Sequence, residues 1–313
     1  MAASSYFSPS ITGSTAALYE MHRAGSHGWG LIATQDIPTG THILHEKAIW
    51  RIKCSIRNQD RKLLQSFRQL SPEMQDTILH LSGGYKDATE SGRRLKTKSR
   101  EEAAQKLRTI LKRNSKLEDG GDESEEGDCF AIYPEIARLN HSCVPNCELM
   151  PVALAERRLT ASKDIKAHEE LTICYVDPCE SYDRREAFLA DAFDFTTACK
   201  CPVCLMCELD ADYLKCSDNR REQLNAGQEM AEDYLYGLGN PPDFAKYSED
   251  RHRDMYRLCK TMVKLATEEK ILGASAAPMY QVVSFAAKGL GWEEKAVKYK
   301  TKTMEVARRF LMV

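Results

Sequence analysis

The sequence predicts an α+β fold, in which a helical insertion interrupts a β-rich unit and a helical C-terminal region follows it. Two distant segments share one design, because ATQDIPTGTHIL at 33–44 is echoed by ASKDIKAHEELTI at 161–173, and both read as short strands around a turn. The segments between and after them carry apolar residues at helical spacing. With 313 residues, 42% of them hydrophobic, the chain can bury a full core in two or three domains.

Charge and composition narrow the partners that we expect. A net charge of −2 predicts no general attraction to nucleic acid or to an anionic membrane, so partners are chosen at local sites. No apolar run is long enough to cross a bilayer, and the first residues lack the basic-then-apolar order of a secretory signal. We therefore expect an intracellular protein, nuclear and/or cytoplasmic, whose 12 cysteines remain thiols or bind metal.

The first half of the chain divides into three parts. Residues 1–15 are small and polar and are expected to be disordered. Residues 16–50 form the first β unit, with Pro38 and Gly40 in its turn. Residues 51–128 hold the helical insertion and an acidic, glycine-rich linker.

Within the insertion, apolar residues at helical spacing predict two helices. The residues of the first are Leu63, Leu64, Phe67 and Leu70, and those of the second are Ala103, Leu107, Ile110 and Leu111. Ser71 followed by Pro72 is a plausible helix start. The basic run at 93–116 is interpreted as the solvated side of a helix. A nucleic-acid patch is the weaker alternative, because Glu101 and Glu102 interrupt the run.

The second half returns to strands and turns at 129–179, continues through a cysteine-rich segment at 180–208, and ends in a helical region at 209–313. Within that last region helical composition covers residues near 217–237, 247–271, 276–289 and 292–311. Gly237, Gly273 and Gly291 fall among the breaks between these helices.

The strongest local signal is CKCPVCLMC at 199–207. Four cysteines in nine residues indicate a tetrahedral zinc site far better than they indicate buried free thiols. All four could bind one ion, or a distant residue could replace Cys207. Cys143, in the segment ARLNHSCVPNC at 137–147, is the candidate for that position.

Two further motifs are ambiguous alone. GWGLIA at 28–33 fits a dinucleotide-binding pattern, but strand-turn-strand sequence follows where a helix should begin, which leaves a glycine pair open to a ligand or a structural turn. EELTICYVD at 169–177 alternates like a strand and contains Tyr175, which by itself indicates only a half-buried strand residue.

Together these motifs resemble a SET-domain protein-lysine methyltransferase with a post-SET zinc segment. Gly28-Trp29-Gly30, then RLNHSCVPN at 138–146, then EEL through Tyr175, then the cysteines from Cys199 onward, occur in the order of that family. The resemblance covers about half of the chain. It is similar to the branch in which an insertion splits the SET domain, as in the SET-and-MYND proteins, but lacks a MYND finger, as some fungal SET proteins do.

The resemblance implies a SET-type β-fold with a pseudoknot and two bound groups. S-adenosylmethionine would be contacted by Gly28, Trp29, Gly30, Asn140, His141, Tyr175 and Phe195. Zinc would be held by Cys143, Cys199, Cys201 and Cys204. Asn146 would satisfy backbone groups within the knot. The family has a glycine where this chain has His168, which predicts a positive φ at that histidine.

The implied activity is methyl transfer to a lysine ε-amine of a histone or another protein. Tyr175 would be catalytic, and Phe193 with Tyr175 would line the lysine channel. The alternative is an inactive SET-fold zinc protein that serves as an interaction module, in which loss of the Asn140, His141 and Tyr175 set would be expected. We expect a monomer with a protein substrate and no direct contact with nucleic acid or membrane.

Overall fold

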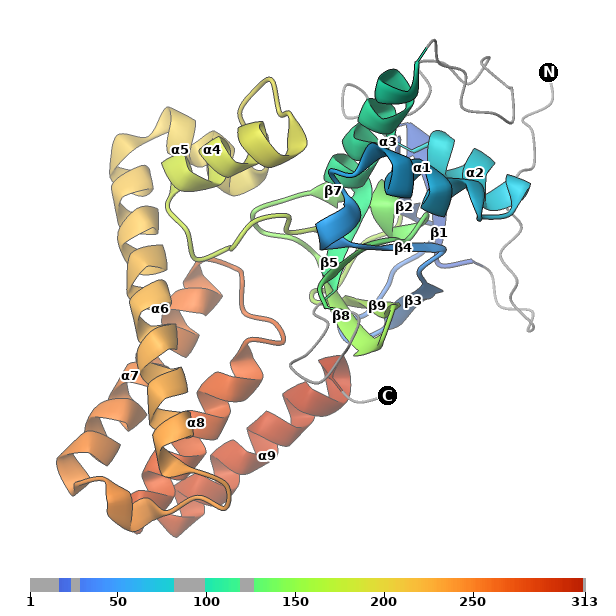
Figure 1. Ribbon diagram of the computed structural model, residues 1–313. Coiled ribbons are helices and arrows are strands. Elements are labelled where there is room, and N and C mark those ends of the chain that lie inside the picture. The colour runs from blue at the N-terminus through green and yellow to red at the C-terminus, as the bar shows by residue number, and fades with distance from the viewer. Residues whose placement is uncertain (1–16, 24–28, 82–98, 119–126, 312–313) are drawn as a thin grey trace.

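The computed structural model describes residues 17–23, 29–81, 99–118 and 127–311 (Figure 1). The disorder expected for residues 1–15 lies outside these described residues, as do Gly28 and most of the acidic linker. None of the described helices is long and apolar enough to cross a bilayer. The chain folds as expected into an α+β protein, with the strands gathered in one part and a helical array beside it.

The strands form small sheets in which distant parts of the chain meet. Their bounds are β1 Tyr19–Arg23, β2 Trp29–Ala33, β3 His42–Lys47, β4 Trp50–Lys53, β5 Ser115–Glu118, β6 Cys129–Ile132, β7 Asn140–His141, β8 Cys147–Ala153, β9 Glu156–Ala161 and β10 Glu170–Ile173. Their orders are β1-β2-β10-β7, β3-β9-β8 and β4-β6-β5. Because β2 is a strand that pairs with β1 and β10, GWGLIA does not open a helix and the dinucleotide alternative is excluded.

The two segments of similar sequence face one another in a local pseudo-twofold arrangement. Ile37 and Ile165 exchange backbone hydrogen bonds of 2.8 and 2.9 Å. The Asp36 carboxylate accepts the Ala167 N–H at 3.0 Å, and in the same way the Asp164 carboxylate accepts the Thr39 N–H at 2.8 Å. The repeated design therefore reflects two turns that cap each other across the β-rich core.

The insertion packs its helices over the β4-β6-β5 sheet. The helices are α1 Asp60–Arg68, α2 Pro72–Leu79 and α3 Arg100–Asn114, with a 3-10 turn, η2, at Cys54–Ile56. Leu63, Phe67 and Leu107 are fully buried in this second core, as their spacing predicts. Ser71 caps α2 by accepting the Met74 N–H at 3.2 Å, which confirms the predicted helix start.

The interpretation of the basic run as a solvated helix face was wrong at its C-terminal end. The helix stops at Asn114, and Ser115–Glu118 form β5, which pairs antiparallel with β6. Lys116 is half-buried there. Pairing with β6, which places Lys116 opposite Ala131 15 residues later, prevails over local helical composition.

From Tyr182 onward the described elements are all helices. They are α4 Tyr182–Phe193, α5 Pro202–Leu209, α6 Ala211–Leu238, η4 Phe244–Lys246, α7 Glu249–Glu268, α8 Ala276–Gly289 and α9 Glu293–Phe310. α6 begins earlier than expected because Asp210 caps it. Sequence analysis assigned no helix to α4. A short 3-10 turn, η3 Ile136–Arg138, precedes β7.

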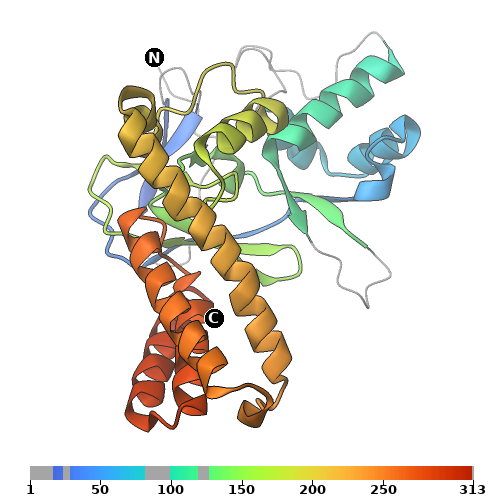
Figure 2. The same cartoon turned by 90° about the vertical axis from the view of Figure 1, so that its left-hand side faces the viewer.

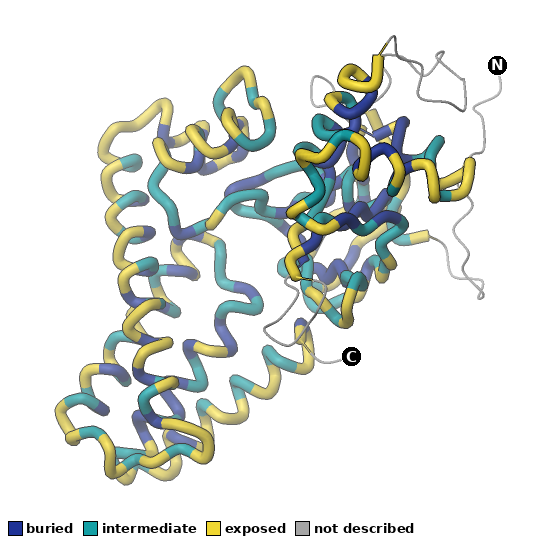
Figure 3. The backbone as a smooth tube through the Cα atoms, viewed as in Figure 1, coloured by how far each residue is buried: buried dark blue, intermediate teal, exposed yellow. Residues whose placement is uncertain are grey.

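The long helix α6 runs from the cysteine-rich segment to the far end of the molecule, and α7, α8 and α9 lie beside it (Figures 1 and 2). Their buried residues face one another, while the outer surfaces are exposed (Figure 3). α9 leads back to the β-rich part, where the Arg158 guanidinium donates to the Phe310 carbonyl at 3.0 Å. The helical array thus contacts the β-rich part at both of its ends.

Candidate active site and metal centre

The segment that carries ARLNHSCVPNC is held against β10. β7 pairs parallel with β10, with Asn140 opposite Thr172, and the Ser142 N–H donates to the Ile173 carbonyl at 3.0 Å. The Asn146 amide donates to the Glu170 carbonyl at 2.8 Å and accepts the Thr172 N–H at 2.9 Å. These contacts confirm that Asn146 satisfies backbone groups of the neighbouring segment.

Four buried thiols converge beside this segment. The Sγ atoms of Cys143, Cys199, Cys201 and Cys204 all lie within 4.8 Å of one another. Sulfurs about 2.3 Å from one tetrahedral zinc ion stand about 3.8 Å apart, and the Cys204 and Cys143 sulfurs are 3.5 Å apart. Cys207 is buried nearby but is not part of the group. The donor set therefore fits zinc, and the geometry favours Cys143 over Cys207.

The thiol cluster has an electrostatic environment suited to a cation. Hydrogen bonds from Cys143, Cys199 and Cys204 hold the pKa of Cys201 well below its ordinary value. A lowered thiol pKa favours the thiolate, the form that binds a metal ion, and metal binding displaces the protons of the other thiols.

Arg185 on α4 is a component of this centre that sequence analysis missed. It is fully buried, and its guanidinium lies 3.9 Å from the Cys204 sulfur. Burial opposes its charge, yet electrostatic attraction and hydrogen bonding to the sulfurs of Cys143 and Cys204 raise the pKa of Arg185 above its ordinary value. Its position in the sequence could have indicated its burial, because Arg185 lies four residues before Leu189 and therefore on the same, buried face of the helix.

His141 connects the cysteine centre to Tyr175. Its Nδ1 accepts the Tyr175 N–H at 3.0 Å, and its Nε2 lies 3.2 Å from the Cys143 sulfur. Burial lowers the pKa of His141 to about 4, so the ring is neutral at physiological pH. Since Nδ1 is an acceptor, the single ring proton resides on Nε2 and is donated to Cys143.

Tyr175 lies in an aromatic cluster. Its ring centroid is 4.7 Å from that of Phe193 and 5.3 Å from that of His141, and the Phe195 ring is 6.2 Å from His141. The Tyr175 hydroxyl donates to the Leu139 carbonyl. Burial, helped by the Glu170 charge, raises the pKa of Tyr175 above its ordinary value and keeps the hydroxyl protonated.

The insertion contributes directly to this region. Asp194, which has a left-handed backbone (φ 57°) between Phe193 and Phe195, accepts hydrogen bonds of 2.9 Å from both Lys112 and Arg113 of α3. The same insertion places the Lys116 ammonium 5.0 Å from the Tyr175 ring centroid. Sequence analysis found neither connection, because both join segments distant in the chain.

The remaining predicted cofactor residues lie on neighbouring strands. The Asn140 amide donates to the Glu170 carboxylate at 2.6 Å, which leaves the amide oxygen able to accept from a ligand. Gly30 is buried in β2, and extending the β2–β10 register by one residue brings it level with Thr172, the partner of Asn140. Trp29 precedes it and is 50% exposed, so its ring is accessible.

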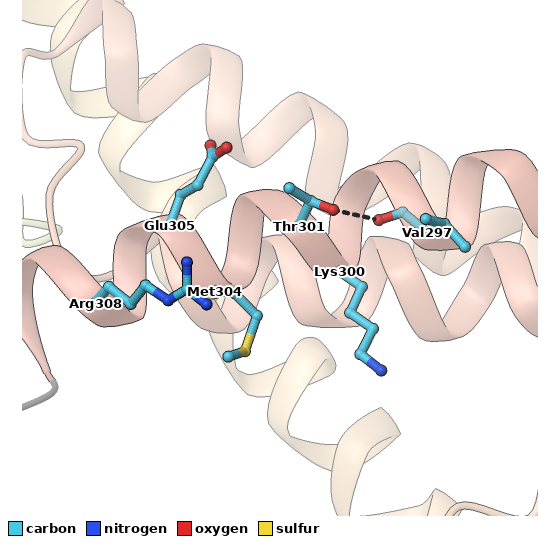
Figure 4. Close-up of a pocket in the computed structure, with 6 residues that line it drawn as sticks. All are labelled: Val297, Lys300, Thr301, Met304, Glu305 and Arg308. Carbon is cyan, nitrogen blue, oxygen red and sulfur yellow. Dashed lines mark hydrogen bonds between the residues drawn. The ribbon is translucent and has the colours of Figure 1, made fainter.

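A separate hollow of about 270 Å³ lies on α9 and is lined by Val297, Lys300, Thr301, Met304, Glu305 and Arg308 (Figure 4). All of its residues are exposed and come from one helix. None belongs to the thiol or aromatic cluster.

Comparison with known proteins agrees with the site. Residues 28–176 match the SET domain family model. The chain is 28% identical over 183 residues to the human histone-lysine N-methyltransferase SMYD3, covering 57% of this chain and 39% of that protein. It is 26% identical over 216 residues to the histone-lysine N-methyltransferase set5 of Schizosaccharomyces pombe, covering 66% of this chain and 56% of the relative.

The chain thus spans about two fifths to somewhat over half of the length of these relatives. Among solved structures, Rubisco LSMT bound to AdoMet aligns with a TM-score of 0.34 at 14% identity, covering 95% of this chain and 89% of that one. The ordered motifs and the family match lead to one conclusion: this chain contains a SET domain, which spans residues 28–176.

Proposed function

We propose that the protein transfers a methyl group from S-adenosylmethionine to the ε-amine of a lysine in a protein substrate. The observation that carries this proposal is that Tyr175 is held beside the segment of Asn140 and His141, which Cys143 joins to the thiol cluster. The names of the relatives, as histone-lysine and protein-lysine methyltransferases, support the same reaction.

The residues present fit both bound groups. When bound, S-adenosylmethionine supplies a methyl group activated on a positively charged sulfur. We assign the Asn140 amide oxygen to the ammonium of its amino-acid part, and the Phe195 ring to its adenine. Zinc on the four thiols would fix Cys143, and hence His141 two residues earlier, to the segment that carries Phe195.

Tyr175 and its neighbours perform the chemical work by positioning. A lysine attacks only as a neutral amine, and the aromatic walls of Tyr175 and Phe193 disfavour its charged form. Because the Tyr175 hydroxyl gives its proton to the Leu139 carbonyl, its lone pairs remain to accept an N–H of the incoming amine. Orientation of the nitrogen lone pair toward the methyl carbon supplies much of the catalysis.

Binding of the methyl donor is the first test. Calorimetric titration of S-adenosylmethionine into zinc-loaded protein should show saturable one-to-one binding that Asn140→Ala abolishes. The matched control is Asn219→Ala, which changes an exposed asparagine on α6. Absence of binding to a folded, zinc-containing wild type would overturn the enzyme assignment and favour an interaction module.

Turnover is the second test. Tyr175→Phe should retain binding of the donor but lose methyl transfer to protein extracts on the order of 100-fold, because the orienting hydroxyl is gone. Retained turnover would remove Tyr175 from the mechanism. We also propose an intracellular location, which the 12 cysteines support because none of them forms a disulfide.

A further inference from the structure

Lys116 lies on the last strand of the insertion, and that strand has an unusual polarity. In β5 the apolar Leu117 is 57% exposed, whereas its charged neighbours Lys116 and Glu118 face inward. Glu118 is buried and binds the Tyr133 hydroxyl at 2.7 Å and the Arg157 guanidinium at 2.9 Å. Charged side chains that face inward while a leucine faces solvent reverse the usual pattern of a strand, and such reversals are typical of functional sites.

Unlike the Glu118 carboxylate, the Lys116 amine has no partner of opposite charge among the described residues. The charge that acts on its pKa is the like charge of Arg157. Its nitrogen instead lies over the Tyr175 ring, 5.0 Å from the centroid. Burial, together with the like charge of Arg157, lowers the pKa of Lys116 to about 8. A half-buried amine that has no carboxylate partner and a lowered pKa is partly neutral at slightly alkaline pH and is then a nucleophile.

These are the properties that a target lysine must acquire in order to react. We propose that Lys116 is a methyl acceptor within its own active site, so that the protein methylates itself. This inference rests on the proposed function, because Tyr175 marks the position of methyl transfer. It adds a modification site on the insertion.

The chemistry balances with S-adenosylmethionine as the only co-reactant. The lone pair of the Lys116 nitrogen forms a bond to the methyl carbon, and the carbon–sulfur bond breaks. The bonding electrons stay on sulfur, which leaves neutral S-adenosylhomocysteine. The methylated ammonium then releases one proton to solvent. Four rotatable bonds in the lysine side chain allow the nitrogen to move from the ring face toward the methyl carbon.

The experiment incubates the zinc-loaded full chain with radiolabelled S-adenosylmethionine, without another substrate, and maps the label by peptide mass spectrometry. Wild type should gain one or more methyl groups on Lys116, at a rate per molecule independent of protein concentration. Lys116→Arg keeps the positive charge and should lose the label. Lys298→Arg, which changes an exposed lysine on α9, should keep it.

The outcomes separate this inference from the proposed function. If calorimetry shows donor binding and extracts are methylated while Lys116 stays unmodified, self-methylation is refuted and the enzyme assignment stands. Label on other lysines, or a rate that rises with protein concentration, also overturns it. If the donor does not bind, both proposals fail. Circular dichroism and zinc content of Lys116→Arg establish that loss of label does not reflect loss of fold.

Discussion

Replacing Asn146 with alanine should destabilise the β-rich part although Asn146 has no assigned contact with a ligand. The residue is 7% exposed, and its amide serves the Glu170 carbonyl and the Thr172 N–H, which alanine cannot do. A buried backbone group left without a partner costs about 1–3 kcal/mol. Two such groups, with some relief from water, give an expected loss of about 3 kcal/mol in the free energy of unfolding.

Urea denaturation of zinc-loaded protein, followed by circular dichroism, measures this loss. Hydrogen exchange at the Thr172 amide measures the same site directly and should accelerate in Asn146→Ala. Asn146→Asp keeps an acceptor for Thr172 but replaces the N–H donor to the Glu169 carboxylate and the Glu170 carbonyl with a carboxylate oxygen, so its loss should be at least as large as that of Asn146→Ala. Asn219→Ala, on the exposed face of α6, should stay within about 0.5 kcal/mol of wild type. Unchanged stability and unchanged exchange in Asn146→Ala would refute the reasoning.

Two further predictions concern charge. Arg185→Met should weaken zinc binding by about 10–100-fold, because it removes the buried cation beside the thiolates. Competition with a chromophoric chelator measures the zinc affinity, and Arg184→Met, which changes an exposed neighbour, is the control. Equal zinc affinities of the two variants would exclude the role of Arg185. Burial raises the pKa of Glu46 from 4.5 to about 7, although it accepts two backbone N–H bonds. Its protonated form is favoured in the folded state, so the stability it contributes is complete below pH 4.5 and is lost as the pH rises through about 7. Glu46→Gln should therefore lose less stability than wild type between pH 5 and pH 8, by up to about 3 kcal/mol in urea denaturation, and identical pH profiles would contradict this.

Features that depend on neighbours in sequence were predictable. Ser71 before Pro72 marked a helix start because a cap acts within one turn. His168 has φ 67°, the positive φ that the family's glycine at this position implied. The close spacing of the cysteines indicated one metal centre, and the family resemblance supplied Cys143 as the distant member.

Features that depend on contacts between distant segments were not predictable. Leu189, one turn after Arg185, indicates a buried helix face, but only the packing of α4 shows that the thiols are what Arg185 contacts there. Lys116 ends a basic run that suggests solvent exposure, yet pairing with β6 turns it inward. In both cases a segment distant in the chain, which local patterns cannot reveal, sets the surroundings of a charged side chain.

The β4-β6-β5 sheet holds both ends of the insertion at fixed positions, so the helices between them can vary. β4 leads into the insertion and β5 leads out of it, and both pair with β6, so that Trp50 and Ser115 stand opposite the same residue, Ile132. Two strands that flank a third are about 10 Å apart, whatever the length of chain between them. Helices could therefore be gained or lost in evolution without opening the sheet. The last strand of the insertion, β5, would still place its own residue, here Lys116, at the face of Tyr175.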